Sequence, residues 1–251
     1  VSNNVNLGPS VVPSIFQSNI SPLTLILDNI QLRDDGFISL SKCIENVRIL
    51  SVASNEITSR GAIVFFSSVD IQFTSLNLSE NRIDDSAIFS IKTNIKKLNI
   101  SSNNFTTSGL IALCERFSKS DTKTLYMNEL KFSKVSKQSF SKLLQSKHLK
   151  NLYLRNCSIS HFPDIPSDSR LKILDLTGNS NIVEFEATPT VTVIGNFLMK
   201  KKIQLNFKEF DKMKEILEKR TKSSLIKEAI QSNSLKKFNQ KLTNLIHYYF
   251  V

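Results

Sequence analysis

The sequence predicts an α/β solenoid, a curved stack of parallel strands on a concave face with helices on the convex face. Three observations predict it. A short apolar phrase recurs seven times along the chain, the copies follow one another at 22 to 27 residues, and several copies continue into apolar residues at helical spacing. A repeat of this length cannot bury its apolar face alone, so stacking of successive copies is what creates a core.

The phrase is an apolar residue, two others, Leu, one other, an apolar residue, two others, Asn, one other and an apolar residue. Residues 47–57, 73–83 and 95–105 fit it at every position, and residues 171–182 fit with the last apolar residue one place late. Its alternating centre is typical of a short strand, in which alternate side chains face one way. The Asn amide is suited to satisfying backbone groups where the chain turns out of the strand.

Three further copies depart from the phrase at the Asn position, where they place Ile30, Leu130 and Cys157. The leucines at the fourth position still recur at intervals of 25, 26, 22, 27, 27 and 22 residues; they are Leu25, Leu50, Leu76, Leu98, Leu125, Leu152 and Leu174. We therefore expect seven parallel strands with these leucines in register.

A second marker predicts the convex helices. Gly36, Gly61 and Gly109 each lie six residues after the Asn-equivalent position, and apolar residues follow at helical spacing in two of these copies. These residues are Phe37, Leu40 and Ile44, and Leu110, Leu113 and Phe117. The sixth copy has two prolines within residues 161–166, so extended or tight-turn structure is expected there instead of a helix.

The phrase, the Gly six residues after the Asn and the spacing of 25 to 27 residues together resemble leucine-rich repeats of the ribonuclease-inhibitor type. The resemblance covers about residues 23–185. It implies the curved solenoid described above, and it implies function only in the broad sense that such solenoids hold other proteins.

Composition divides the chain into three parts. Residues 1–22 contain three prolines with Ser and Asn and read as an irregular lead-in or N-terminal cap. Residues 23–199 form the predicted solenoid, closed by a last strand near residues 190–195. Residues 200–251 form a predicted helical extension with one helix near residues 207–231 and another at Leu235–Tyr249. The second helix has a heptad-like seam of two heptads, and it either folds back on the solenoid or is offered to a partner.

The net charge of +11 is concentrated in the extension, where 13 Lys and Arg face 5 Asp and Glu. This composition predicts a basic patch that attracts acidic proteins, nucleic acid or anionic membranes, although a solvated helix face explains the lysines equally well. No nucleic-acid-binding module is recognisable, which makes nucleic acid the weaker candidate. The patch comprises Lys200, Lys201, Lys202, Lys236 and Lys237.

The sequence offers no catalytic constellation. The three histidines have no partners at metal-ligand spacing, and there is no Gly-rich phosphate loop or G-x-S-x-G turn. A loose group of Cys157, His161 and Asp164 is a weak candidate for a metal or nucleophile site. The paired carboxylates 34–35 and 84–85 precede convex helices, where acidic residues complement the helix N-termini. We therefore expect no enzyme activity, no cofactor and no metal.

The three cysteines are widely spaced and odd in number, which favours a reducing compartment over a disulfide framework. No apolar stretch approaches the roughly 20 residues needed to cross a bilayer. The first residues have neither a basic nor an apolar leader, so we expect no signal peptide, and the missing initiator Met indicates a fragment or a processed chain.

The side chains between the core leucines point into the concave groove, and most are small and polar. The fifth and sixth copies differ, because Tyr126 and Tyr153 should be neighbours there, with Arg155 nearby, Glu129 on the rim and Lys97 one strand earlier. Tyr and Arg are enriched at binding hot spots. This patch is the predicted partner-binding site, and ordinary cross-strand packing of exposed aromatics is the alternative.

These features predict a non-catalytic scaffold for protein–protein interaction, as a structural component or adaptor of a larger intracellular assembly. Cytoplasmic, cytoskeletal and microtubule-associated assemblies are candidates, and a partner with an acidic surface is expected. One alternative is a regulatory subunit of a GTPase or phosphatase system, although leucine-rich-repeat proteins that activate GTPases typically carry an acidic tail and this tail is basic. Another is a binder of nucleic acid or anionic surfaces that acts through the extension.

Overall fold

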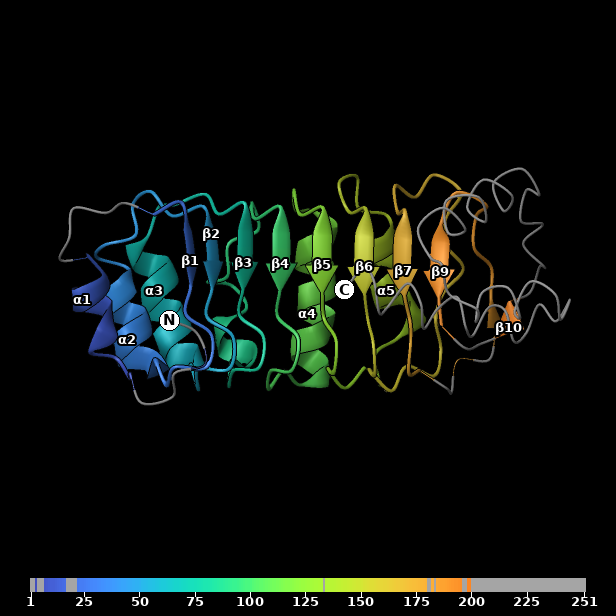
Figure 1. Ribbon diagram of the computed structural model, residues 1–251. Helices are drawn as coiled ribbons and strands as arrows, with labels where there is room; N and C mark the ends of the chain where they lie inside the picture. Colours follow the sequence, from blue (N-terminus) through green and yellow to red (C-terminus); the bar gives the residue numbers. More distant parts are fainter. Residues whose placement is uncertain are drawn as a thin grey trace, which may run out of the picture.

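The computed structural model describes residue 3 and residues 7–16, 22–132, 134–179, 182, 184–195 and 198–199. Within these ranges the chain forms a row of parallel strands with helices on one face of the sheet (Figure 1). The basic extension at 200–251, with its two predicted helices and its five patch lysines, lies outside the described residues.

One open, curled sheet of eight strands runs the length of the solenoid, in the order β1-β2-β3-β4-β5-β6-β7-β9. Its strands are β1 Thr24–Ile26, β2 Ile49–Ser51, β3 Ser75–Asn77, β4 Lys97–Asn99, β5 Thr124–Tyr126, β6 Asn151–Tyr153, β7 Ile173–Asp175 and β9 Thr192–Ile194. Every pair is parallel, and the seven repeat leucines are aligned from Leu25 to Leu174, with Val193 as the eighth member. The predicted register is therefore confirmed.

The helices occupy the face of the sheet where the resemblance places them (Figure 1). They are α2 Arg33–Leu40, α3 Ser59–Ser68, α4 Thr107–Ser118 and α5 Lys137–Leu144, with α1 Val11–Phe16 beside α2 in the lead-in. Side-chain hydroxyls of Thr58, Thr106 and Ser136 cap α3, α4 and α5 by accepting from backbone amides of the first turn. The glycine marker predicts α2, α3 and α4 but misses α5, because Ser136 stands six residues after Leu130 in that copy.

In the described part of the chain, the third, sixth and seventh copies have no α-helix. The third copy spans only 22 residues between leucines and has a single 3-10 turn, η1 Asp85–Ala87, because it has too few residues for a helix of the usual length. The sixth copy, with its two prolines, has neither helix nor strand across residues 157–166, in agreement with the prediction that no helix forms there. Next to it, the short strands β8 Glu184–Phe185 and β10 Leu198–Met199 form a separate parallel pair.

The repeat asparagines join one copy to the copy before it. Asn55 is fully buried, and its side-chain oxygen accepts from the amides of Ile30 and Leu32 at 3.0 and 3.1 Å. Its side-chain nitrogen donates to the carbonyls of Leu27 and Ala53. The Asn of each copy thus bonds to the backbone of the preceding copy. The first copy has no preceding repeat, so its Asn-equivalent position needs no polar side chain and Ile30 is tolerated there.

Asn81, Asn103 and Asn179 repeat these backward bonds in their own copies. Cys157 preserves part of the pattern, because its thiol contacts the Met127 and Arg155 carbonyls at 3.1 and 3.2 Å. The departures at Ile30 and Cys157 therefore follow what each position must bond, whereas Leu130 has no polar side-chain atom for such a bond.

A second set of backward contacts links the convex helices. The Asp34 carboxylate accepts from the amide and hydroxyl of Thr58, and Asp85 does the same for Thr106. A methyl group at Gly61 would lie 2.4 Å from the Asp34 Oδ1 atom, and one at Gly109 would lie 1.8 Å from the Asp85 Oδ1 atom. Glycine is therefore required where the carboxylate of one copy reaches the helix N-terminus of the next.

The core is one continuous column of buried apolar side chains between the sheet and the convex elements. Phenylalanines fill the wider spaces, and Phe37 stacks on Phe65 with ring centroids 4.0 Å apart. A second chain of ring contacts runs through Phe132, Phe140, Phe162 and Phe185. In the part of the chain that the structure describes, no helix has both the length and the apolar character of a membrane span.

Candidate functional site

The candidate site lies on the concave face, which is the sheet surface opposite the helices. Strand pairing places Asn99, Tyr126, Tyr153 and Asp175 next to one another on β4 to β7. Alternate residues of these strands are buried leucines, so the intervening side chains are fixed on the opposite face. The strand register thus aligns these four residues in one row, although consecutive members lie more than 20 positions apart in the sequence.

Tyr126 and Tyr153 form the centre of the site. Their rings stack with centroids 4.3 Å apart and an angle of 6° between the planes. Lys97 approaches from β4 with its Nζ atom 5.4 Å from the Tyr126 centroid, and the Arg155 guanidinium lies 5.9 Å from the Tyr153 centroid. Both distances are within the range of cation–π attraction, so the stack has a cation beside each ring.

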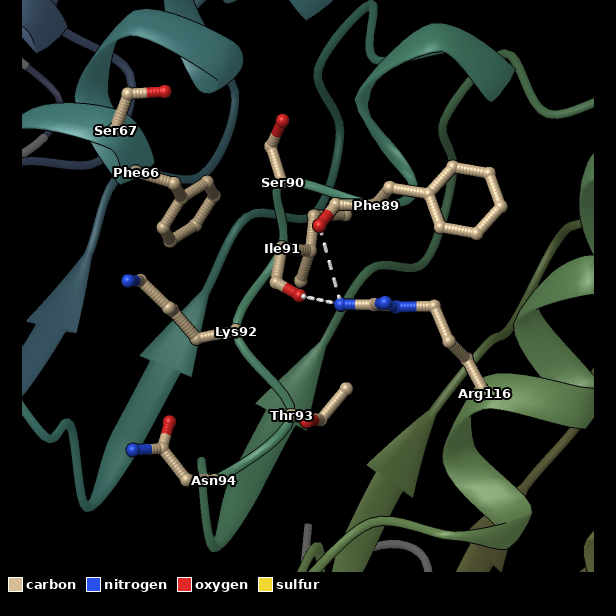
Figure 2. A pocket seen from close by; sticks show the side chains of 9 residues that line it. All are labelled: Phe66, Ser67, Phe89, Ser90, Ile91, Lys92, Thr93, Asn94 and Arg116. Atoms are coloured by element: carbon tan, nitrogen blue, oxygen red, sulfur yellow. Dashed lines mark hydrogen bonds between the residues drawn. The ribbon is translucent and has the colours of Figure 1, made fainter.

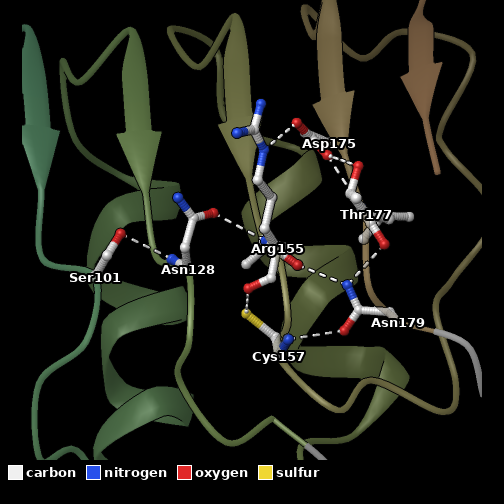
Figure 3. A network of polar contacts seen from close by, with 9 residues as sticks. Ser101, Asn128, Arg155, Cys157, Asp175, Thr177 and Asn179 are labelled. Carbon is white, nitrogen blue, oxygen red and sulfur yellow. Dashed lines mark hydrogen bonds and ion pairs between the residues drawn. The ribbon is translucent and has the colours of Figure 1, made fainter. Parts of the chain in front are cut away.

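Arg155 is fixed by an ion pair with Asp175 on β7 (Figure 3). Asp175 is fully buried, and its other oxygen accepts from the amide and hydroxyl of Thr177 at 3.0 and 2.7 Å. The Arg155 amide also donates to the Asn128 side chain. The guanidinium is therefore held in place before any partner binds, which lowers the entropic cost of using it for recognition.

Asp175 is the functional residue that sequence reasoning missed as a member of the site. The signal was present, because Asp175 occupies the column position of Tyr126 and Tyr153 one strand further along. Its pairing with Arg155 became visible only when the β6–β7 register placed the two side chains together.

Glu129 lies in the turn that follows β5. Its carboxylate accepts from the Ser102 hydroxyl at 2.9 Å, so it links the turns after β4 and β5. Its backbone has a φ of 58°, in the left-handed region. The structure therefore brings Lys97, Tyr126, Tyr153 and Arg155 together, with Glu129 at the periphery.

The electrostatics of the stack favour neutral rings. Burial raises the pKa of Tyr126 above its ordinary value, and burial raises the pKa of Tyr153, with Tyr126 adding to the effect. Both phenols therefore stay protonated at neutral pH, where each hydroxyl can donate and accept a hydrogen bond. The site offers two rigid rings, two hydroxyls, the Lys97 ammonium group and a guanidinium of Arg155 that is paired with Asp175.

A different hollow, of about 470 Å³, lies on the helix side where η1 replaces a full helix (Figure 2). The Arg116 guanidinium lies beside Phe89 and donates to the carbonyls of Phe89 and Ile91 at 3.3 and 2.8 Å. The Phe89 side chain itself is 75% exposed. The hollow is open and mostly polar, and it follows from the shortness of the third copy.

The loose group of Cys157, His161 and Asp164 is not a built site. Cys157 is buried and burial raises the pKa of its thiol to about 12, whereas His161 bonds to Ser160 and Asp164 accepts from the Glu186 amide. Across the described ranges, no group of three or more His, Cys, Asp and Glu side chains is placed to hold a metal ion.

No curated protein sequence matches the chain. A solved structure titled "Crystal structure of TLR13-ssRNA13 complex" is 16% identical, with a TM-score of 0.42, and the match covers 71% of this chain. It covers 29% of the other chain, so this chain spans less than a third of that protein's length.

A family model described as "Leucine Rich repeat" matches residues 44–66, 73–91 and 92–114. These stretches contain β2, β3 and β4, and they coincide with the three copies that fit the phrase at every position. The repeated phrase, the aligned leucines of the parallel sheet and the family match agree, and the chain contains leucine-rich repeats in a solenoid fold.

Proposed function

We propose that this protein is a non-catalytic scaffold that holds another protein on its concave face through Tyr126, Tyr153, Arg155 and Lys97. Leucine-rich repeats generally mediate protein–protein interaction and are typically non-catalytic, which supports the class of function. The observation that carries the proposal is the stacked tyrosine pair with a cation beside each ring.

The stack fits a binding role for physical reasons. Two rings held parallel by neighbouring strands have little conformational freedom to lose, so they present apolar area and hydroxyls at low entropic cost. The neighbouring positions of the concave face carry smaller polar side chains, including the half-buried Asn77 and Asn99. A partner therefore meets its largest and most rigid contacts at the tyrosines.

The finer parts of the proposal concern the setting. We place the protein in a reducing, cytoplasmic compartment because its three cysteines, Cys43, Cys114 and Cys157, are free thiols. A role as a component or adaptor of a larger assembly, with cytoskeletal and microtubule-associated assemblies among the candidates, fits a chain whose folded surface is mostly repeat. No cofactor is part of this function.

A second candidate function rests on the charge of residues 200–251, which carry a net charge of +8. In that case the extension binds nucleic acid or an anionic surface, and the solenoid is its carrier. The regulatory-subunit alternative shares the concave site with the main proposal and differs in the identity of the partner.

The test is capture of partners from native lysate with the wild-type chain and two variants, quantified by mass spectrometry. Tyr126→Ala with Tyr153→Ala removes the concave stack, and Phe89→Ala removes the exposed ring on the helix side as a matched control. The proposal predicts a set of proteins that are captured equally by the wild type and by Phe89→Ala, and whose capture persists at raised salt. The captured amount of these proteins should fall at least tenfold with the concave variant. Equal capture by both variants would reject it.

A further inference from the structure

Four lysines stand in a row where consecutive strands begin. Each directly precedes a strand: Lys96 before β4, Lys123 before β5, Lys150 before β6 and Lys172 before β7. Backbone hydrogen bonds fix the row, because the Lys123 amide donates to the Lys96 carbonyl at 2.9 Å, and the next two pairs follow at 2.8 and 2.6 Å. All four side chains are exposed. They form a lysine ladder with a strand-to-strand spacing of about 4.8 Å.

The segments around the ladder extend its charge into a basic rim, made of residues 92–97, 119–123, 147–150 and 168–172. They contain nine Lys and Arg against the two acids Asp121 and Asp168, a net charge of +7. Residues 1–199 as a whole carry only +3, so the rim concentrates positive charge that the rest of this part does not share. The corresponding edge before β2 and β3 has Arg48 with Glu45 and Asp70 and lacks this excess.

Few acidic side chains of the basic rim neutralise the positive charge of the ladder lysines. Asp121 pairs with His148 at 3.5 Å, and among the described side chains no ion pair involves a ladder lysine. Like charges side by side on neighbouring strands destabilise a sheet. Their spacing is shorter than the Debye length of about 8 Å at physiological salt, so screening does not remove the repulsion. A row of this kind is consistent with a surface that an anionic partner neutralises.

The rim adjoins the concave site, and Lys97 belongs to both. Lys97 follows ladder residue Lys96 in the chain, and its Nζ atom lies over Tyr126. Lys123 precedes Tyr126 by three residues, and Lys150 precedes Tyr153 by three, so the ladder runs parallel to the stacked rings at roughly 10 Å. A partner seated on the tyrosines is therefore within reach of the ladder.

The chemistry of the site favours an acidic protein segment over nucleic acid. Single-stranded nucleic acid is usually held by bases that stack on open aromatic faces. Here the two rings stack on each other, and Lys97 and Arg155 flank them, so carboxylates are better suited to the site than bases. The three ladder intervals span about 14 Å, which an extended segment of about four or five residues matches.

We propose that the basic rim binds an acidic segment of the protein that the concave site holds, with the lysine ladder contacting a run of Asp or Glu carboxylates. The proposal rests on the function proposed above, which it deepens by naming the chemistry of the partner. The ladder supplies charge, and the tyrosine stack supplies the rigid contact beside it.

The test uses the full chain and a fluorescently labelled polyglutamate peptide of about 20 residues, titrated at low salt. One variant replaces the ladder with Lys96→Gln, Lys123→Gln, Lys150→Gln and Lys172→Gln. The control makes the same charge change at four exposed lysines away from the rim, Lys42→Gln, Lys131→Gln, Lys134→Gln and Lys137→Gln. Residues 200–251 are unchanged in both variants and contribute equally.

Exposed ion pairs are worth about two- to threefold in affinity each, so the ladder variant should bind roughly 15- to 80-fold more weakly than the wild type. The control should change binding less than threefold. Equal weakening by both variants would overturn the proposal, because it would mean that only net charge matters. The thermal midpoint of the ladder variant should be equal to or above that of the wild type, and a clear fall would assign the lysines a structural role and also overturn the proposal.

Two further probes decide the class of partner. A labelled thymidine oligonucleotide of about 20 nucleotides and vesicles containing phosphatidylserine should each bind more weakly than polyglutamate and show a smaller ladder effect. A larger ladder effect with either would replace the acidic protein with that anion. The tyrosine variant should keep most of its polyglutamate affinity, so loss of the ladder effect and loss of partner capture by the tyrosine variant are separate failures.

Discussion

The asparagine ladder gives a stability prediction that can be worked from single bonds. In Asn55→Ala, the amides of Ile30 and Leu32 lose their acceptor in a position that is fully buried in the wild type. A buried donor left unpaired costs about 1–3 kcal/mol, so the variant should lose about 2–6 kcal/mol of unfolding free energy. That is a large part of the roughly 5–15 kcal/mol that stabilises a typical domain.

The assay is denaturant unfolding followed by circular dichroism, with Asn104→Ala as the matched control. Asn104 is exposed, so its loss should change the unfolding free energy by less than about 0.5 kcal/mol. Hydrogen exchange adds a local readout, because the amides of Ile30 and Leu32 should exchange much faster in Asn55→Ala. An Asn55→Ala protein as stable as Asn104→Ala, with unchanged protection of these amides, would refute the assigned role of the repeat asparagines.

Three further predictions concern the contacts between copies and the thiols. Gly109→Ala forces its methyl group against the Asp85 carboxylate, so it should destabilise the protein by about 1–3 kcal/mol in the same unfolding assay, and an unchanged midpoint would contradict the close approach. The Ser86 hydroxyl, followed by the other hydrogen bonds to that carboxylate, holds the pKa of Asp84 below its ordinary value. A depressed folded-state pKa stabilises the protein above the unfolded-state value near 4, so this contribution should fade as pH falls below about 4, and unfolding of Asp84→Ser should depend less on pH there. Burial raises the pKa of the Cys114 and Cys157 thiols to about 12. Iodoacetamide at pH 8 should therefore leave both thiols unmodified in the native protein and label both after unfolding, as peptide mapping would show.

Much of the fold could be predicted from the sequence because the repeat carries its own register. Once Leu50, Leu76 and Leu98 are recognised as equivalent, parallel stacking leaves one alignment, and the structure has it. The helix α5 could not be predicted in this way, because Ser136 replaces the glycine marker in that copy. The missing helix of the third copy, which has only η1, could be predicted from its length, because 22 residues leave too little chain for a full helix.

The candidate site was predictable to the level of neighbouring strands. Alternation and register place Tyr126 beside Tyr153, whereas the direction of each long side chain depends on its surroundings. Arg155 forms an ion pair with Asp175, and Glu129 accepts a hydrogen bond from Ser102. The spacing of the repeats alone does not predict either contact. The members of the lysine ladder occupy the second position of the phrase in the fourth to seventh copies, at intervals of 27, 27 and 22 residues, so the sequence already aligns them. Their exposure side by side at the strand starts comes from the structure.

The most direct test of the concave-scaffold proposal is site-specific photo-crosslinking with benzoylphenylalanine in the full chain. The probe is placed at Asn99, next to Tyr126 in the strand register, and separately at Phe89 on the helix side. With native partners present, the proposal predicts a partner crosslink from position 99 that disappears when Tyr126→Ala and Tyr153→Ala are added, and no such crosslink from position 89. Crosslinking from position 89 alone, or from position 99 regardless of the tyrosines, would contradict it.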